Sequence, residues 1–457
     1  MRPLKLINKN LFQGGIIMTP ATVRNSFFAI LSNTEDNIEA FVNNPGADMT
    51  RHRYCDFKNT VLATLSFSMN RSNTELLDFF GFKNKHIPSK SAFTQQRKKF
   101  NGNLYPHLLS SFNKVIPLTK TFNGFHLIAA DGTDINLPTD KHDTVYRVKQ
   151  ARSDNFYFQM HLNALYDICE NRFISAITQP RPQMNENAAF CQLISECDMP
   201  DNTIFIADRG YITLNTLAHL LENNRYFLIR AKSPTSSGSM TKDIIAPNVP
   251  SDKYVKIDIS RSEKNRRKSE ADVFKKIGPN RKFDYISADD KKSVYTMNLR
   301  CTCIKIDEDS YEYLISNLPF EIFSSKDLKA LYWKRWSIET SFRSLKYALS
   351  LVYLHSVNRD LIIQEIFAKM LLYNITALIH AYAQNSKELL ERNRNKKHQY
   401  KVSFDDTVPI AKALLKEPVK NSIVKALLLR HLTAVNVIVT SARHLRSQTV
   451  KPLNNRA

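Results

Sequence analysis

Four residues spaced along one stretch of the chain could do chemistry on a phosphodiester: Tyr332, Arg335, Glu339 and Lys346. At roughly 100° per residue of α-helix, this spacing places the four side chains within an arc of about 60° on one helix face. One stripe would then carry an aromatic ring, two cations and a carboxylate. Such a face suits a site that holds a metal ion beside a phosphodiester.

Two further carboxylates follow short apolar runs that predict strands. Asp131 ends the run 126–131 and Asp208 ends the run 203–208, and small residues follow each in Asp-Gly-Thr and Asp-Arg-Gly-Tyr. Reactive groups collect at the strand ends of α/β sheets. Three carboxylates brought together would repel one another, and a pair of Mg²⁺ ions would relieve that repulsion. Two such ions about 3.5–4 Å apart activate an attacking oxygen and stabilise a leaving oxygen.

Each of these residues also has an ordinary structural explanation. An aspartate at a strand end is usually a turn or cap residue. Glu339 lies four residues from both Arg335 and Arg343, a spacing that gives common and weak helix ion pairs. Tyr332 and Trp336 could belong to the core. Each of these explanations accounts for a single residue. None of them explains why two matched strand-end motifs and one complete tetrad occur in the same chain.

The charge of the chain favours a polyanionic partner. Among 457 residues, 65 are Lys or Arg and 43 are Asp or Glu, which gives a net charge of +22. Nucleic acid is the commonest partner of so basic a protein. A basic housekeeping protein remains an alternative, and a membrane-surface protein is disfavoured because no basic amphipathic helix dominates.

Other features of the composition exclude whole classes of protein. The chain has only 10 glycines, so a phosphate-cradling loop and a nucleotide cofactor are not expected. No secretory signal and no apolar run of membrane-spanning length is present, which predicts no membrane partner. The six cysteines are scattered and predict free thiols in a reducing cytoplasm rather than a zinc site.

Residues 1 to about 20 look like a loose leader, and residues 21 to about 120 read as helices. A helix over 74–80, a break at Gly81 and a basic helix from Ser89 outline a helix-turn-helix, although a plain helical bundle fits as well. Gln95, Arg97 and Lys98 are residue types that contact bases and phosphates, so we predict that this region binds DNA.

From residue 121 the pattern predicts a mixed α/β domain. Strand, hairpin, helix, strand, helix and strand follow in order, then a β-rich insertion over about 233–322, then helices, of which 362–383 is apolar enough to be core. We therefore expect three regions: 1–120 helical and DNA-binding, 121–384 catalytic with its insertion, and 385–457 a basic C-terminal region.

These motifs carry a resemblance to a known family. The sequence resembles the DDE transposases of the insertion sequence 4 family, which have Asp-Gly-Thr/Ser, Asp-Arg-Gly-Tyr and a Y-x2-R-x3-E-x6-K signature in this order. All three stand here without a substitution, and the resemblance covers roughly residues 50–385. It implies a ribonuclease-H-like catalytic core with a helical N-terminal DNA-binding domain.

The resemblance also implies roles for single residues. Asp131, Asp208 and Glu339 would be the catalytic residues and would hold two Mg²⁺ ions, with Mn²⁺ as a substitute. Arg335 and Lys346, with the neighbouring Arg343, would contact DNA. Tyr332 would contact a phosphate or stack near a base turned out of the duplex.

The implied reaction is cut-and-paste DNA transposition without ATP. Cleavage at terminal inverted repeats, in relatives often through a hairpin, would be followed by attack of the 3′-OH ends on target DNA. A homodimer on paired transposon ends, in the bacterial cytoplasm with the nucleoid, is expected from the family. The alternatives are an inactive DNA-binding regulator and a metal-dependent nuclease; a carbohydrate hydrolase fits the basic charge poorly.

Overall fold

A computed structural model describes residues 12–13, 17–51, 54–81, 87–150, 154–308, 310–394 and 398–436. Most of the leader and the end of the basic tail, with Arg443, Arg446 and Lys451, lie outside the described residues.

The centre of the molecule is a sheet with the strand order of ribonuclease H. Strands β3 (His126–Leu137), β5 (Phe156–Asp167) and β6 (Arg172–Pro180) are antiparallel neighbours, and β7 (Thr203–Ala207) and β8 (Tyr226–Ala231) continue the sheet parallel to β3. The resulting order β6-β5-β3-β7-β8 confirms the predicted fold class, a mixed α/β ribonuclease-H-like core.

The β-rich insertion extends this same sheet. β12 (Tyr311–Ser316) pairs with β8, and β11 (Val294–Lys305), β9 (Ser251–Ser260) and β10 (Val273–Lys276) follow in that spatial order. With β4 (Arg147–Lys149) beside β5, the sheet has ten strands. The sequence did not predict β10, which is only four residues long and half-exposed.

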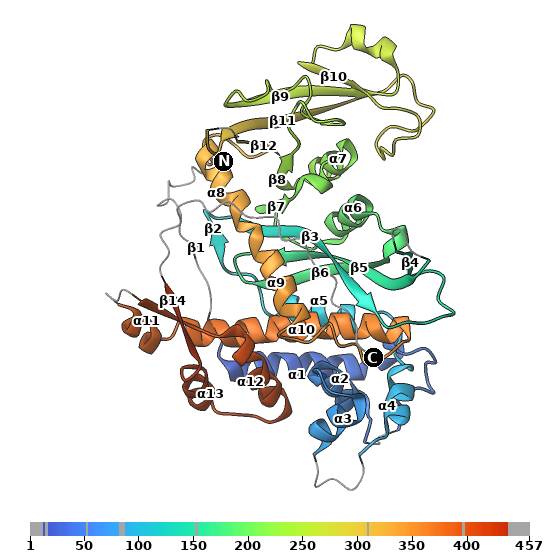
Figure 1. Cartoon of the computed structure of the whole chain (residues 1–457), viewed down its shortest axis with the longest axis vertical. Coiled ribbons are helices and arrows are strands. Elements are labelled where there is room, and N and C mark those ends of the chain that lie inside the picture. The colour runs from blue at the N-terminus through green and yellow to red at the C-terminus, as the bar shows by residue number, and fades with distance from the viewer. Residues whose placement is uncertain are drawn as a thin grey trace.

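Alternate residues of each strand pack against different helical layers. Ile128 and Ala130 join the cluster formed with α6 (Glu186–Glu196) and α7 (Leu214–Glu222). Leu127 and Ala129 join the cluster on the opposite face, where α8 (Ser325–Lys334), α9 (Trp336–Lys346) and α10 (Arg359–Gln384) lie. The central strands β3 and β7 are therefore buried between two layers of helices (Figure 1).

The predicted core helix, α10 (Arg359–Gln384), is the centre of the larger helical layer. It packs against α1 (Pro20–Asp36), α2 (Phe57–Ser66), α5 (Leu104–Val115) and α12 (Phe404–Lys416). The helices from both ends of the described chain thus share one hydrophobic cluster around α10 (Figure 1).

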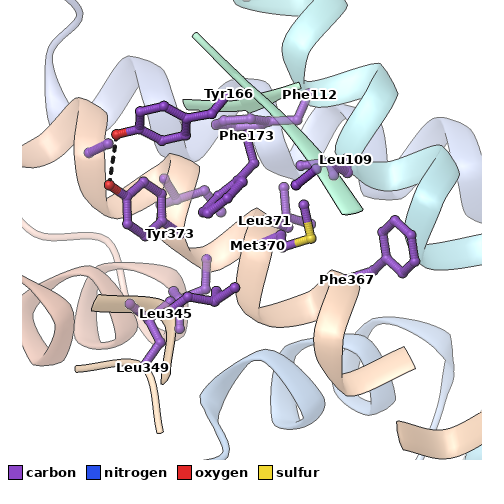
Figure 2. Packing of buried hydrophobic residues seen from close by; sticks show 14 of the residues in the cluster. Leu109, Phe112, Tyr166, Phe173, Leu345, Leu349, Phe367, Met370, Leu371 and Tyr373 are labelled. Atoms are coloured by element: carbon purple, nitrogen blue, oxygen red, sulfur yellow. Dashed lines mark hydrogen bonds between the residues drawn. The ribbon is translucent and has the colours of Figure 1, made fainter. Parts of the chain in front are cut away.

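Aromatic side chains join α10 to the sheet. The hydroxyls of Tyr166 on β5 and Tyr373 on α10 lie 2.9 Å apart, and the Phe173 ring packs against both tyrosines (Figure 2). By length and composition α10 could cross a membrane, but 94% of its most apolar window is buried inside the protein. This burial identifies it as a core helix, as the sequence predicted.

The remaining elements are short. They are α3 (Ser72–Phe80), α4 (Lys90–Arg97), α11 (Lys387–Asn393), α13 (Asn421–Leu428), β1 (Phe12–Gln13), β2 (Thr121–Phe122), β13 (His398–Val402), β14 (Leu432–Asn436), and 3₁₀ turns at 38–41, 181–183, 209–211 and 263–268. All six cysteines lie in the described part of the chain and are buried free thiols, as predicted.

Candidate active site

The stripe of four predicted residues lies on two helices rather than one. α8 (Ser325–Lys334) ends with Tyr332 in its last turn, and α9 (Trp336–Lys346) carries Glu339 and Lys346. Arg335 stands at the junction, with helical φ and ψ of −53° and −33°. The N–H of Arg335 donates to the carbonyl of Tyr332, three residues earlier in the chain, at 3.0 Å. One tighter turn of the 3₁₀ type therefore joins α8 to α9.

The first two carboxylates come from neighbouring strands. The pairing of β3 with β7 ends at Ala130 and Ala207, so Asp131 and Asp208 are the next residues on each strand. Asp208 follows the last residue of β7, as predicted. Asp131 does not end its strand, because β3 continues to Leu137 paired with β5; only its pairing with β7 stops there.

The third carboxylate, Glu339, reaches the same place from α9. Burial raises the pKa of Asp131 to about 6, and the charges of Glu339 and Asp208 push it in the same direction against the opposing charge of Arg335. The three predicted carboxylates therefore share one electrostatic environment, although they come from three different elements.

Arg335 lies between two of these carboxylates. Its guanidinium donates to Asp131 Oδ2 at 3.2 Å and to Glu339 Oε1 at 2.9 Å, and the residue is only 5% exposed. Burial opposes the charge on Arg335, but Tyr332 and the surrounding carboxylates raise its pKa above its usual range. The cation thus offsets the repulsion that the carboxylates would otherwise exert on one another.

Tyr332 is turned inward onto the remaining carboxylate. Its ring is buried, and its hydroxyl donates to Asp208 Oδ1 at 2.9 Å. Although burial acts to raise it, the pKa of Asp208 is lowered by hydrogen bonds from the Arg209 N–H and from Tyr332. In this arrangement the ring has no free face for a nucleotide base, contrary to the stacking role implied by the family.

The carboxylates suit a hard divalent cation in their chemistry, but they are engaged by other partners. Oxygen donors without His or Cys are the set that Mg²⁺ and Mn²⁺ prefer. Across the described residues, no three His, Cys, Asp or Glu side chains lie close enough together to hold one metal ion. Arg335 and Tyr332 donate hydrogen bonds to carboxylate oxygens that a metal would need.

The other predicted DNA-contacting residues of α9 differ in exposure. Arg343 is exposed to solvent, whereas Lys346 is half-buried. Burial lowers the pKa of Lys346, and the carboxylate of Asp134 opposes that shift. Both cations therefore stand on α9 with Glu339, and of the two only Arg343 faces open solvent.

Basic side chains surround the turn that carries Asp208. A cavity of about 410 Å³ is lined by Asp208, Arg209 and Lys232 among others. A second cavity of about 500 Å³ shares Arg209 and Lys232 with it and adds Arg230. The two adjoining cavities therefore present three cations to an anion such as phosphate, two of them in the cavity that Asp208 lines.

The predicted DNA-contacting residues of the N-terminal region do not share one surface. Gln95 and Lys98 are exposed at the end of α4. Arg97 is 2% exposed, and its guanidinium bonds to Glu365 Oε1 at 2.9 Å and to the Leu361 carbonyl at 2.6 Å on α10. The side chain predicted to contact DNA is therefore enclosed in the helical core instead.

One polar cluster behind the catalytic strands is absent from the sequence-based prediction. His161 lies between Asp134 and Glu186, directly beneath Gly132. His161 lies opposite Asp134, three residues beyond Asp131, through the pairing of β3 with β5, and the predicted hairpin of β5 with β6 does not reveal this neighbour.

This combination of fold and site defines a class of protein. A ribonuclease-H-like sheet with carboxylates on β3, after β7 and on a following helix is the arrangement of metal-dependent nucleases and polynucleotidyl transferases. The family model described as the transposase DDE domain matches residues 124–375, more than half of the chain. The chain therefore belongs to the transposase DDE domain family.

Two further comparisons bear on relatives. No curated protein compared with the chain matches it. The cryo-EM structure of the piggyBac transposase synaptic complex with hairpin DNA resembles this structure with a TM-score of 0.45 and 11% sequence identity, over 95% of this chain and 90% of that chain.

Proposed function

We propose that this protein is a DNA transposase of the insertion sequence 4 family. It cuts DNA at the terminal inverted repeats of its element in a metal-dependent reaction and joins the freed 3′-OH ends to target DNA. The observation that carries the proposal is the convergence of Asp131, Asp208 and Glu339 on Arg335, within a transposase DDE domain. The bacterial cytoplasm and a homodimer on paired ends belong to the same proposal.

The residues of the site divide the work of phosphoryl transfer. Asp131, Asp208 and Glu339 would hold two Mg²⁺ ions, which activate the attacking oxygen and stabilise the leaving oxygen when bound. Arg335, released from the carboxylates, would bind the phosphate beside the scissile bond. Tyr332 holds Asp208 in place through its hydroxyl before DNA arrives.

Other cations would hold the DNA strand on either side of the cut. Arg209 and Lys232 line the cavity beside Asp208, and Arg230 lines the adjoining cavity. These three cations would bind the phosphate backbone of the DNA. Arg343 and Lys346 extend the basic surface along α9. The expected regions, a DNA-binding part before residue 121, a catalytic part to 384 and a basic C-terminal part, remain part of the proposal.

The test uses purified protein with DNA that carries the inverted repeats flanking its gene. With Mg²⁺ or Mn²⁺ we expect cleavage at the repeat ends and covalent joining to a target plasmid, both visible on denaturing gels. Asp131→Asn, Asp208→Asn and Glu339→Gln remove one negative charge each at nearly constant shape. Each should abolish cutting while DNA binding, followed by gel shift, stays within a few-fold.

The possible results separate the alternatives. Repeat-specific binding with no cutting in either metal would identify a DNA-binding regulator. Cutting without joining would identify a nuclease. Near-normal cutting by Glu339→Gln would show that α9 does not supply the third carboxylate.

A further inference from the structure

A histidine cluster lies on the face of the sheet opposite to the catalytic helix. His161 on β5 pairs across the sheet with Asp134 on β3. It contacts Glu186 of α6 on one face of the sheet, whereas α9, which carries Glu339, lies on the other face. Figure 1 shows α6 and α9 on these two sides. His161 is only 5% exposed. A charged side chain buried to this extent needs partners of opposite charge inside the protein.

Two carboxylates flank the imidazole. His161 Nδ1 lies 2.6 Å from Asp134 Oδ1, and its Nε2 lies 3.0 Å from Glu186 Oε1. The second contact is an ion pair without good hydrogen-bond alignment, because Nε2 has no partner at hydrogen-bond geometry. Although burial acts against the charge, these two partners raise the pKa of His161 to about 9. The ring is therefore a cation at neutral pH, and Arg181 braces Asp134 from the side at 3.0 Å.

The imidazole supports the backbone next to a catalytic carboxylate. A Cβ atom on Gly132 would lie 2.3 Å from His161 Nε2 and 3.0 Å from Glu186 Oε1. Only glycine permits so close an approach. The N–H of Gly132 in turn donates to Asp131 Oδ1 at 2.9 Å. His161 thus packs against Gly132, whose N–H orients the carboxylate of Asp131.

The same cluster reaches the second catalytic turn through α6. Glu186 Oε2 would be 3.8 Å from a Cβ atom on Gly210, two residues after Asp208. The next residue of α6, Asn187, donates from Nδ2 to the Gly210 carbonyl at 3.2 Å. The first turn of α6 therefore contacts the backbone that follows each of the two aspartates.

We propose that His161, clamped between Asp134 and Glu186, is a positioning residue that sets the separation of Asp131 and Asp208. His161 contacts neither Asp131 nor Asp208 directly. It acts on them through Gly132 and the start of α6. The proposal rests on the metal-dependent function proposed above. Residues that orient metal ligands in this way typically change metal affinity about 10- to 100-fold when removed.

The test is titration calorimetry of Mn²⁺ into the protein without DNA. We expect His161→Ala to weaken Mn²⁺ binding about 10- to 100-fold while the circular dichroism spectrum is retained. His161→Gln keeps one donor and much of the volume and should recover part of that affinity. His219→Ala is a matched control, because it removes a histidine–carboxylate contact of 2.8 Å to Asp284, away from the catalytic turns. It should leave Mn²⁺ binding unchanged.

Gly132→Ala separates positioning from packing. The added methyl group collides with the imidazole, so this variant should unfold at a lower temperature than the wild type. Combining it with His161→Ala removes the collision and should restore the unfolding temperature to that of His161→Ala, while Mn²⁺ binding stays weak. If the role of His161 were purely structural, the unfolding temperature and the Mn²⁺ affinity of the double variant would be restored together.

The results distinguish this inference from the proposed function. Wild-type protein that neither binds Mn²⁺ nor cuts repeat DNA with it would overturn the proposed function and this inference together, whereas a wild type that cuts but binds no Mn²⁺ without DNA would overturn the inference alone. Wild-type binding that His161→Ala leaves within two-fold would overturn the inference alone. Should His161→Ala not fold, the titration of His161→Gln decides by the same criterion.

Discussion

Removing Arg335 should tighten divalent metal binding in the absence of DNA, although this residue is part of the catalytic signature. The guanidinium makes two charge-assisted contacts, at 3.2 Å to Asp131 and 2.9 Å to Glu339. A metal ion that takes up these oxygens must first break both contacts. The free energy of those contacts therefore counts against metal binding in the wild type.

The size of the effect follows from the geometry. Hydrogen bonds to charged groups contribute about 1.5–3 kcal/mol each. The side chains of Asp131 and Glu339 are 22% and 36% exposed, so solvent screens both contacts and reduces each below that range, to about 0.7–1.4 kcal/mol. A sum of about 1.4–2.8 kcal/mol corresponds to about 10- to 100-fold tighter binding in Arg335→Ala.

The assay is calorimetric titration of Mn²⁺ or Mg²⁺ into each DNA-free variant. Arg343→Ala is the matched control, because it removes the same charge from an exposed position on the same helix. It should shift the metal affinity by less than three-fold. Unchanged or weaker metal binding in Arg335→Ala would refute the competition between guanidinium and metal. DNA cutting by Arg335→Ala should still be low, because the phosphate loses its cation.

Three further predictions concern the helical core and the DNA. Arg97→Met leaves the Glu365 carboxylate buried without its cation and should lower the free energy of unfolding by about 3–5 kcal/mol in urea melts, whereas Arg97→Met/Glu365→Leu should recover most of it. Burial lowers the pKa of Lys369, which donates to the Phe67 carbonyl, to about 7. The unfolded chain keeps the Lys369 proton to a higher pH than the folded protein does. The melting temperature of the wild type should therefore rise relative to that of Lys369→Met between pH 7 and 9. A constant difference between the two melting temperatures would contradict this prediction. DNA binding should weaken steeply with salt, and a flat slope in fluorescence titrations from 50 to 200 mM would exclude phosphate contacts as its main source.

Much of the catalytic core could be predicted because the motifs and the strand patterns agree. The apolar runs before Asp131 and Asp208 form neighbouring parallel strands, so two residues far apart in sequence become adjacent. Period-two patterning does not show where the pairing of one strand with its neighbour ends. For that reason Asp131 was expected at a strand end, whereas β3 continues with β5 as its partner.

The errors concern side chains whose partners come from distant elements. Arg97 has the residue type that binds DNA, but it lies one turn after buried Phe93, on the inner face of α4. Its partner Glu365 is 268 residues away, and no local pattern reveals such a pairing. The inward turn of Tyr332 onto Asp208, 124 residues away, has the same origin.

The position of α10 also governs the order in which the chain can fold during synthesis. Helices α1, α2 and α5 are complete at Val115, but the helix that buries their apolar faces begins at Arg359, roughly 240 residues later. At about 5–20 residues per second, the ribosome needs about 12–50 s to supply it. The part of the chain made first is therefore among the last to become stable. We expect fragments that end before α10 to be degraded, which pulse proteolysis would show, so that prematurely terminated chains do not compete with the intact protein for DNA.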